Sequence, residues 1–131
     1  MKGEENSLSP FIYIRRRITD VLICTAFIMF DPQNGNMNGK KRPVLILNKT
    51  PEYYDVIPLT TKINKRTDVF ILHHWREYSL HEKSGILLKE IFRVHPNLIN
   101  LRPLGRVSER EFSLIIELIK DKGIAINNQI I

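Results

Sequence analysis

Short apolar segments separated by polar breaks make up most of the chain after residue 19. Five of them are rich in β-branched and aromatic residues, which is typical of strands. They are predicted at Val21–Phe30, Pro43–Asn48, Tyr53–Leu59, Thr67–His73 and Gly85–Val94. Because proline has no N–H for a strand ladder, Pro58 predicts a sheet edge or a bulge within the third strand.

One later segment has helical spacing. Its apolar residues recur at intervals of three and four, at Phe112, Ile115, Ile116 and Ile119. Ser108 and Glu111 form a capping box in front of it, and Gly123 is a stop signal behind it. The pattern predicts a helix over Glu109–Lys122 with one face towards a core.

This order of elements predicts a mainly β fold with a C-terminal helix. We expect a small antiparallel sheet or a partly open barrel, with the helix packed on one side. Residues 1–18 are predicted as a partly disordered extension, 19–126 as the domain and 127–131 as a tail. The Gly- and Asn-rich residues 31–41 are expected to form a long mobile loop. Residues 95–107 contain two prolines and leave room for at most a short helical turn.

Composition narrows the class of protein. The 131 residues are 43% hydrophobic and 26% charged, which is ordinary for a globular domain that needs no disulfides. The single cysteine, Cys24, excludes an internal disulfide and fits a reducing compartment. No apolar run is long enough to span a bilayer, and the N-terminus lacks the apolar core of a secretory signal. We therefore expect a cytoplasmic protein without a membrane partner.

Charge is concentrated in one part of the chain. The formal net charge is +6, and seven cations against two anions between Gly39 and Arg66 account for +5 of it. A basic concentration of this kind favours a polyanionic partner such as nucleic acid or an acidic protein segment. The alternative is a solvated surface without a partner.

The sequence contains few of the residue patterns that form metal or cofactor sites. Of the four histidines, His73 and His74 are adjacent, so on a strand they would point to opposite faces. The chain has no HExxH motif, no Cys/His cluster and no glycine-rich phosphate loop. We expect neither a metal nor a cofactor.

Two polar residues stand at neighbouring strand ends. Arg42 begins one predicted strand and Thr60 follows the next. If these strands pair in antiparallel fashion, both residues lie at one end of the sheet, where a guanidinium and a hydroxyl can bind a phosphodiester. The alternative is that they are ordinary strand-end residues, because both types are common there.

A series of motifs resembles the MazF/PemK/Kid family of toxin endoribonucleases. The motifs are DPxxG at 31–35, GKKRPVLIL at 39–47, VIPLTTK at 56–62, KSGILLKEI at 83–91 and LRPLGRVS at 101–108. They stand in the family's order, and the resemblance covers about residues 20–122. The family usually opens its first strand with Gly-Asp, whereas this chain has Thr19-Asp20.

The resemblance implies a small SH3-like β-barrel with a C-terminal helix, usually as a homodimer. It implies a metal-independent endoribonuclease that cleaves single-stranded RNA and is held inactive by an acidic antitoxin. The family's catalytic arginine matches Arg42, and its catalytic threonine or serine matches Thr60. A family serine matches Ser84, and a position often occupied by glutamine matches Glu90.

Metal-free RNA cleavage can use the 2′-hydroxyl of the substrate as nucleophile. Arg42 suits stabilisation of the charge on the phosphate oxygens, and Thr60 can hydrogen-bond a phosphate oxygen or orient the 2′-hydroxyl. Arg42 is a poor base, because a guanidinium does not deprotonate in proteins. Glu90 is the candidate acid/base residue, with His73 and His81 as weaker candidates.

Other residues are candidates for RNA binding. They are Lys40, Lys41, Thr61, Lys62 and Ser84. The loop 31–41 would close over bound RNA. Three aromatic residues are candidates either for base stacking or for packing: Tyr53, Tyr54 and Trp75.

Two non-enzymatic functions remain open. CcdB toxins resemble the same fold and poison DNA gyrase by binding it, and fold does not fix function. A basic module that binds nucleic acid without cutting it would also explain the charge. Neither alternative needs the pair Arg42 and Thr60.

Overall fold

The computed structural model describes residues 22–29, 39–64, 67–73, 76, 80 and 82–130. Its strands are β1 (Leu22–Ile28), β2 (Lys40–Lys49), β3 (Tyr54–Thr60), β4 (Val69–Ile71), β5 (Gly85–Leu87), β6 (Ile91–Val94), β7 (Ile99–Arg106) and β8 (Ile126–Asn128). Its helices are the 3₁₀-helix η4 (Pro96–Leu98) and the α-helix α3 (Glu109–Lys122). Four sequence predictions fall outside the described residues, namely those for residues 1–18, the loop residues 31–38, Trp75 and His81.

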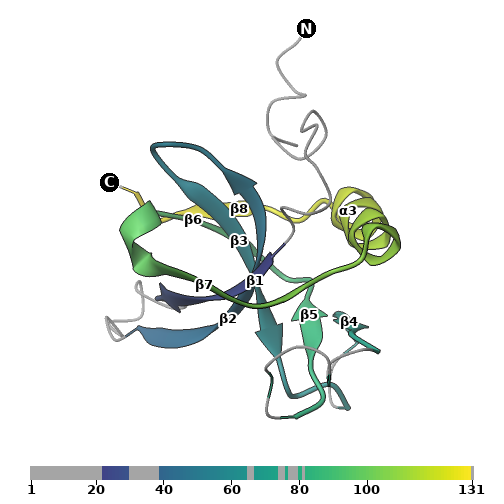
Figure 1. Ribbon diagram of the computed structural model, residues 1–131. Helices are drawn as coiled ribbons and strands as arrows, with labels where there is room; N and C mark the ends of the chain where they lie inside the picture. The colour runs from purple at the N-terminus through teal and green to yellow at the C-terminus, as the bar shows by residue number, and fades with distance from the viewer. Residues whose placement is uncertain are drawn as a thin grey trace, which may run out of the picture.

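The described strands form one sheet beside the helix α3 (Figure 1). The order along the sheet is β4-β5-β3-β2-β1-β7, and β6 joins β3 next to β5. All pairs are antiparallel except β6 with β8. Within the described residues this path runs from β4 to β7 without closing. The prediction of a mainly β fold with a C-terminal helix is confirmed, in the form of an open sheet.

Both faces of the central strands are buried. Along β2, Leu45 and Leu47 belong to the cluster under α3, whereas Val44 and Ile46 belong to a second cluster on the opposite face. This explains why β2 and β3 have nearly continuous apolar sequences rather than an alternating pattern. Cys24 lies in the second cluster, and burial raises the pKa of its thiol. These two strands therefore form a fixed support for whatever stands at their ends.

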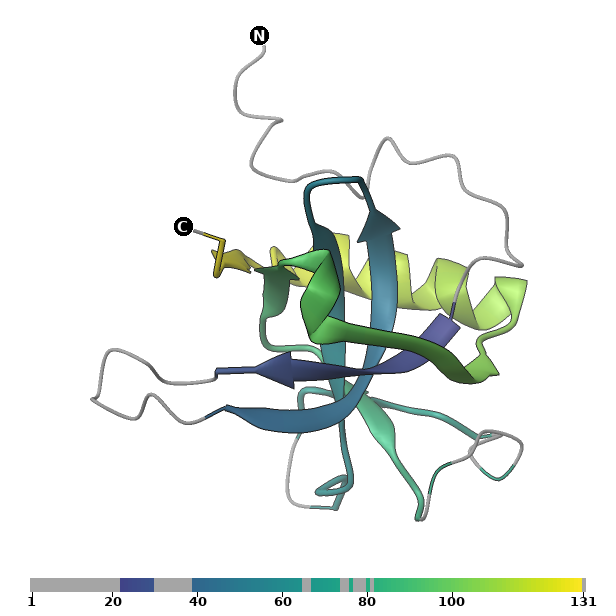
Figure 2. The ribbon, with the colours of Figure 1, turned by 60° about the vertical axis from the view of Figure 1, so that its left-hand side comes forward.

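The helix α3 has the bounds that the sequence predicts. The Ser108 side chain accepts a hydrogen bond from the Glu111 N–H at 3.1 Å, and Gly123 ends the helix in a left-handed conformation with φ of 60°. Phe112, Ile115 and Ile119 are buried against the sheet. Figure 2 shows α3 running across one side of the strands.

Two of the predicted strands need correction. The predicted strand Gly85–Val94 is two strands, because a turn at Leu88 and Lys89 separates β5 from β6. The two pieces pair with different parts of β3. Lys40 and Lys41 belong to β2 and not to the predicted loop. The remaining predicted strands agree with β1, β3 and β4 apart from their ends.

Pro58 lies where β5 and β6 separate. The prediction was a sheet edge or a bulge, but β3 has neighbours on both sides, and the irregularity in its pairing with β2 lies at Ile46/Asn48 rather than opposite Pro58. β6 pairs with β3 up to Val56, and β5 pairs from Leu59 onward. Pro58 falls between them, where the missing N–H costs no ladder bond on that side.

Two strands were not predicted. β7 occupies much of the proline-containing segment 95–107, where the sequence indicated only a turn, and η4 is that turn. β8 includes Asn127 and Asn128, which were predicted to lie in the tail. Gln129 continues this contact, since its N–H donates to the Arg93 carbonyl at 2.8 Å. These segments owe their extended form to pairing partners distant in sequence.

Candidate active site

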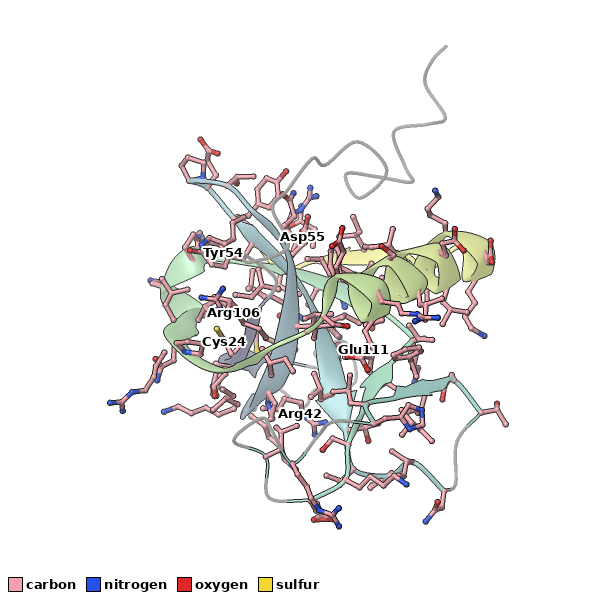
Figure 3. All side chains as sticks on the ribbon, turned by 45° about the vertical axis from the view of Figure 1, so that its right-hand side comes forward. Cys24, Arg42, Tyr54, Asp55, Arg106 and Glu111 are labelled. Atoms are coloured by element: carbon pink, nitrogen blue, oxygen red, sulfur yellow. The ribbon has the colours of Figure 1, made fainter. Side chains whose placement is uncertain are left out.

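The register of β2 and β3 brings Arg42 and Thr60 to the same end of the sheet. Val44 is paired with Pro58. Two residues further along each antiparallel strand, Arg42 and Thr60 stand opposite each other. Figure 3 shows Arg42 at the end of the sheet away from Tyr54 and Asp55. The predicted juxtaposition is therefore confirmed.

A cavity of about 770 Å³ opens at this end. Its volume is in the range of small-molecule and nucleotide sites. The residues that line it are Lys41, Arg42, Pro43, Pro58, Leu59, Thr60, Thr61, Lys62, Ser84, Leu87, Lys89, Glu90 and Phe92. They come from β2, β3, β5, β6, the turns that follow β3 and β5, and the residue that precedes β5. Segments far apart in the sequence thus contribute to one site.

Arg42 and Thr60 have the exposure that a binding role needs. Both are half-buried, and the Nε atom of Arg42 is shielded from solvent. The hydroxyl oxygen of Thr60 accepts a hydrogen bond from the Lys62 N–H at 3.1 Å. The Thr60 oxygen is the acceptor in this bond, so the hydroxyl hydrogen of Thr60 remains available for donation to a ligand.

Ser84 and Gly85 shape the neighbouring wall. Gly85 is paired with Thr60 on one side and Ile71 on the other. A Cβ atom at Gly85 would lie 2.8 Å from the Phe70 carbonyl oxygen and 2.3 Å from a Val69 methyl group, so β4 and β5 approach closely only with glycine there. Ser84 is buried, and its hydroxyl donates to the Glu82 carbonyl at 2.9 Å. Because its hydrogen is used in this bond, the Ser84 hydroxyl can interact with a ligand in the cavity only as an acceptor.

Charge in the lining is strongly positive. The described lining residues include four cations and one carboxylate. The cations are Lys41, Arg42, Lys62 and Lys89, and the carboxylate is Glu90. Lys89 was not predicted as a site residue, although it directly precedes Glu90. Its place in the lining depends on the turn between β5 and β6, which the sequence did not predict.

The other candidates divide into two groups. Lys41, Thr61 and Lys62 are exposed lining residues, as predicted for contact with RNA. Lys40 is paired with Ile28 and is not among the lining residues. The weaker base candidate His73 is exposed but does not line the cavity either.

The candidate stacking residues Tyr53 and Tyr54 lie at the other end of β3, away from the cavity. The ring of Tyr53 packs against the Arg93 guanidinium, whose central carbon is 3.9 Å from the ring centre. Tyr54 is buried, with the Lys49 ammonium 5.9 Å from its ring centre. These contacts support the packing alternative for both tyrosines.

A buried ion pair organises that other end. Asp55 is fully buried, and Arg93 donates to its two oxygens at 2.8 and 3.1 Å. The hydrogen bond to Asp55 raises the pKa of Arg93 further above its usual range. Asn48 donates to the same carboxylate at 3.4 Å. The group ties β2, β3 and β6 together.

Two searches of the described residues gave negative results. No group of three or more His, Cys, Asp and Glu side chains within these ranges is placed to hold a metal ion. Among the helices found there, none has the length and apolar character needed to cross a membrane.

Comparison with known proteins places this geometry in a family. A search of curated proteins finds no match to the chain. A family model described as PemK-like, MazF-like toxin of type II toxin–antitoxin system matches residues 25–121, well over half of the sequence. The matched region contains both strands that carry Arg42 and Thr60, together with every residue of the cavity lining. The chain therefore belongs to the PemK-like, MazF-like toxins of type II toxin–antitoxin systems.

Proposed function

We propose that the protein is a metal-independent endoribonuclease that cleaves single-stranded RNA at the cavity beside Arg42 and Thr60. Proteins of this toxin family are in general RNA-cleaving. The observation that carries the proposal is the meeting of these two side chains at one strand end, inside a cavity lined by three further cations. A phosphodiester needs this combination of a planar bidentate donor, a hydroxyl donor and positive potential.

The reaction begins with attack of a substrate 2′-oxygen on the adjacent phosphorus. The 2′-hydroxyl gives its proton to water, the bond from phosphorus to the 5′-oxygen breaks, and the leaving oxygen takes up a proton from water, giving a 2′,3′-cyclic phosphate and a 5′-hydroxyl end. Arg42 stabilises the charge that grows on the phosphate oxygens. Thr60 donates a hydrogen bond to one of them or orients the attacking hydroxyl. The half-buried position of both groups strengthens these interactions, because less water competes for them.

The lysines of the lining bind the RNA backbone on either side of the cleaved bond. Lys41, Lys62 and Lys89 are exposed around the half-buried Arg42 and Thr60, so they are placed for phosphates on either side of the cleaved one. Contacts of this kind contribute affinity without sequence preference and weaken as the salt concentration rises.

Membership of a type II system implies an antitoxin partner. The finer proposal is that this antitoxin is acidic, which the positive lining supports. We also include the homodimer in the proposal. Phe27 on β1 and Leu98 on η4 belong to two elements in contact with each other and are 38% and 37% exposed, so they offer apolar surface that a second copy could cover. Sedimentation equilibrium tests the dimer against a monomer of 15.4 kDa.

The reaction is tested with a long unstructured RNA in excess EDTA. We expect discrete cuts with 2′,3′-cyclic phosphate ends. A second RNA carries a single 2′-deoxynucleotide on the 5′ side of one mapped cut, and we expect that cut alone to disappear. Cleavage of the deoxy-substituted bond would exclude the 2′-hydroxyl as nucleophile. Intact RNA with folded, antitoxin-free protein would favour the binding functions, on gyrase or on nucleic acid.

A further inference from the structure

Glu90 is an unusual residue in a site built for a polyanion. Among the lining residues that the structure describes, it is the one acidic side chain, beside four cations. It is half-buried, and its carboxylate makes no hydrogen bond or ion pair with any residue that the structure describes. The two oxygens of this carboxylate therefore keep their acceptor capacity for a ligand. A ligand that presents hydrogen-bond donors would use it.

The position of Glu90 separates it from the proposed reaction centre. β6 pairs Phe92 with Val56 on β3. Glu90 lies just before β6, whereas Thr60 is paired with Gly85 on β5, four residues along β3 from Val56. Four residues of a strand span about 13 Å. A side chain at Glu90 is therefore placed for the nucleotide next to the cleaved bond rather than for the attacked phosphorus.

The surface around Glu90 suits a base better than a phosphate. The apolar residues Pro58, Leu87 and Phe92 also line the cavity but are buried, so its polar side chains provide most of the contacts. Recognition of a base by such a wall depends on the hydrogen bonds of the base edge. A phosphate would be repelled by the carboxylate. The edge of a base is thus the part of an RNA that fits beside Glu90.

The chemistry of a carboxylate selects among the four bases. An ionised carboxylate has two acceptor oxygens and no donor. Guanine alone presents two adjacent donors on its Watson–Crick edge, at N1–H and the N2 amino group. Adenine and cytosine place one amino donor next to a ring-nitrogen acceptor, and uracil places one N–H between two carbonyl oxygens. Only guanine can form two parallel hydrogen bonds to Glu90 without repulsion.

We infer that Glu90 is a specificity-determining residue that selects guanine at the nucleotide next to the cleaved bond. The inference rests on the proposed RNA-cleaving function and gives its site a substrate preference. It also replaces the acid/base role that the sequence suggested for Glu90 with a binding role.

The test compares cleavage maps of wild type and Glu90→Gln on an RNA pool of random sequence in EDTA. The amide replaces one acceptor by a donor, so it cannot pair with both guanine donors. We expect the wild type to cut next to guanine and the variant to lose about 10- to 100-fold of the guanine preference. Glu82→Gln is the matched control, because Glu82 is an exposed acid of the same segment that does not line the cavity. Its map should equal that of the wild type.

A change in the RNA gives a readout independent of the variant. Inosine lacks the N2 amino group of guanosine. Replacing the guanosine beside a mapped cut by inosine should slow wild-type cleavage at that cut about 10-fold and leave cleavage by Glu90→Gln nearly unchanged.

Three results would overturn the inference. The first is a guanine preference that persists in Glu90→Gln, and the second is wild-type cutting without any preference for guanine. The third is a uniform loss of rate in Glu90→Gln with an unchanged map, which would indicate an acid/base role. Intact RNA with the wild type would instead overturn the proposed function, and the inference with it.

Discussion

The two ends of β3 carry polar groups of opposite character. At the beginning of the strand, the buried carboxylate of Asp55 is fully engaged by Arg93 and Asn48. At its other end, Thr60 opens into a cavity whose carboxylate, Glu90, has no partner among the described residues. One cluster is closed and satisfied, whereas the other exposes donors and positive charge to solvent.

This difference distinguishes polar groups that stabilise the fold from polar groups that are available to a ligand. Both clusters stand on the same rigid strand, so neither local flexibility nor burial of the backbone distinguishes them. What distinguishes them is whether the hydrogen-bonding capacity of each side chain is used within the protein. The Asp55 carboxylate accepts three hydrogen bonds from within the protein and is closed to solvent. The Arg42 end keeps a hydroxyl hydrogen, a carboxylate and several ammonium groups for one.

The largest effect on stability is expected at the closed end. Asp55→Ala leaves the Arg93 guanidinium partly buried without its carboxylate, and we expect a loss of about 3 kcal/mol in the free energy of unfolding. Urea denaturation measures the change. Glu52→Ala, at a nearby exposed acid, should change it by less than about 0.5 kcal/mol.

The same variant tests the separation of the two ends. Under conditions where Asp55→Ala is folded, its rate of RNA cleavage should equal that of the wild type. A large loss of cleavage in a folded sample would show that the Asp55 cluster belongs to the functional site.

A smaller effect, on activity rather than stability, is expected at the open end. Thr60→Val keeps the shape of the side chain and removes its hydroxyl, so it should lower the cleavage rate about 10-fold, which is the value of one neutral hydrogen bond. Thr60→Ser retains the hydroxyl and is the matched control. Equal rates for wild type and Thr60→Val would remove this hydroxyl from the reaction.

The sequence predicted best those features that depend on local signals. The helix Glu109–Lys122 was predicted to the residue, because its cap at Ser108 and its stop at Gly123 are adjacent in sequence. The meeting of Arg42 and Thr60 was also predictable, since it needs only the pairing of two successive strands.

Features that depend on distant partners were not predictable. The split between β5 and β6 arises because each pairs with a different part of β3. β7 has several exposed residues in a row, including Leu101 and Pro103, so it lacks the alternation that indicates a strand, and its pairing with β1 holds it extended. The position of Lys89 in the site follows from the same split.

The most direct test of the central claim is to measure cleavage and unfolding in the same preparation of Arg42→Ala. The claim is that the open end of β2 and β3 performs chemistry and contributes little to folding. We predict a loss of RNA cleavage of about 100-fold or more in EDTA, as for removal of one charge-stabilising donor, with an unfolding free energy within about 1 kcal/mol of the wild type. Retained cleavage by folded Arg42→Ala would contradict the account.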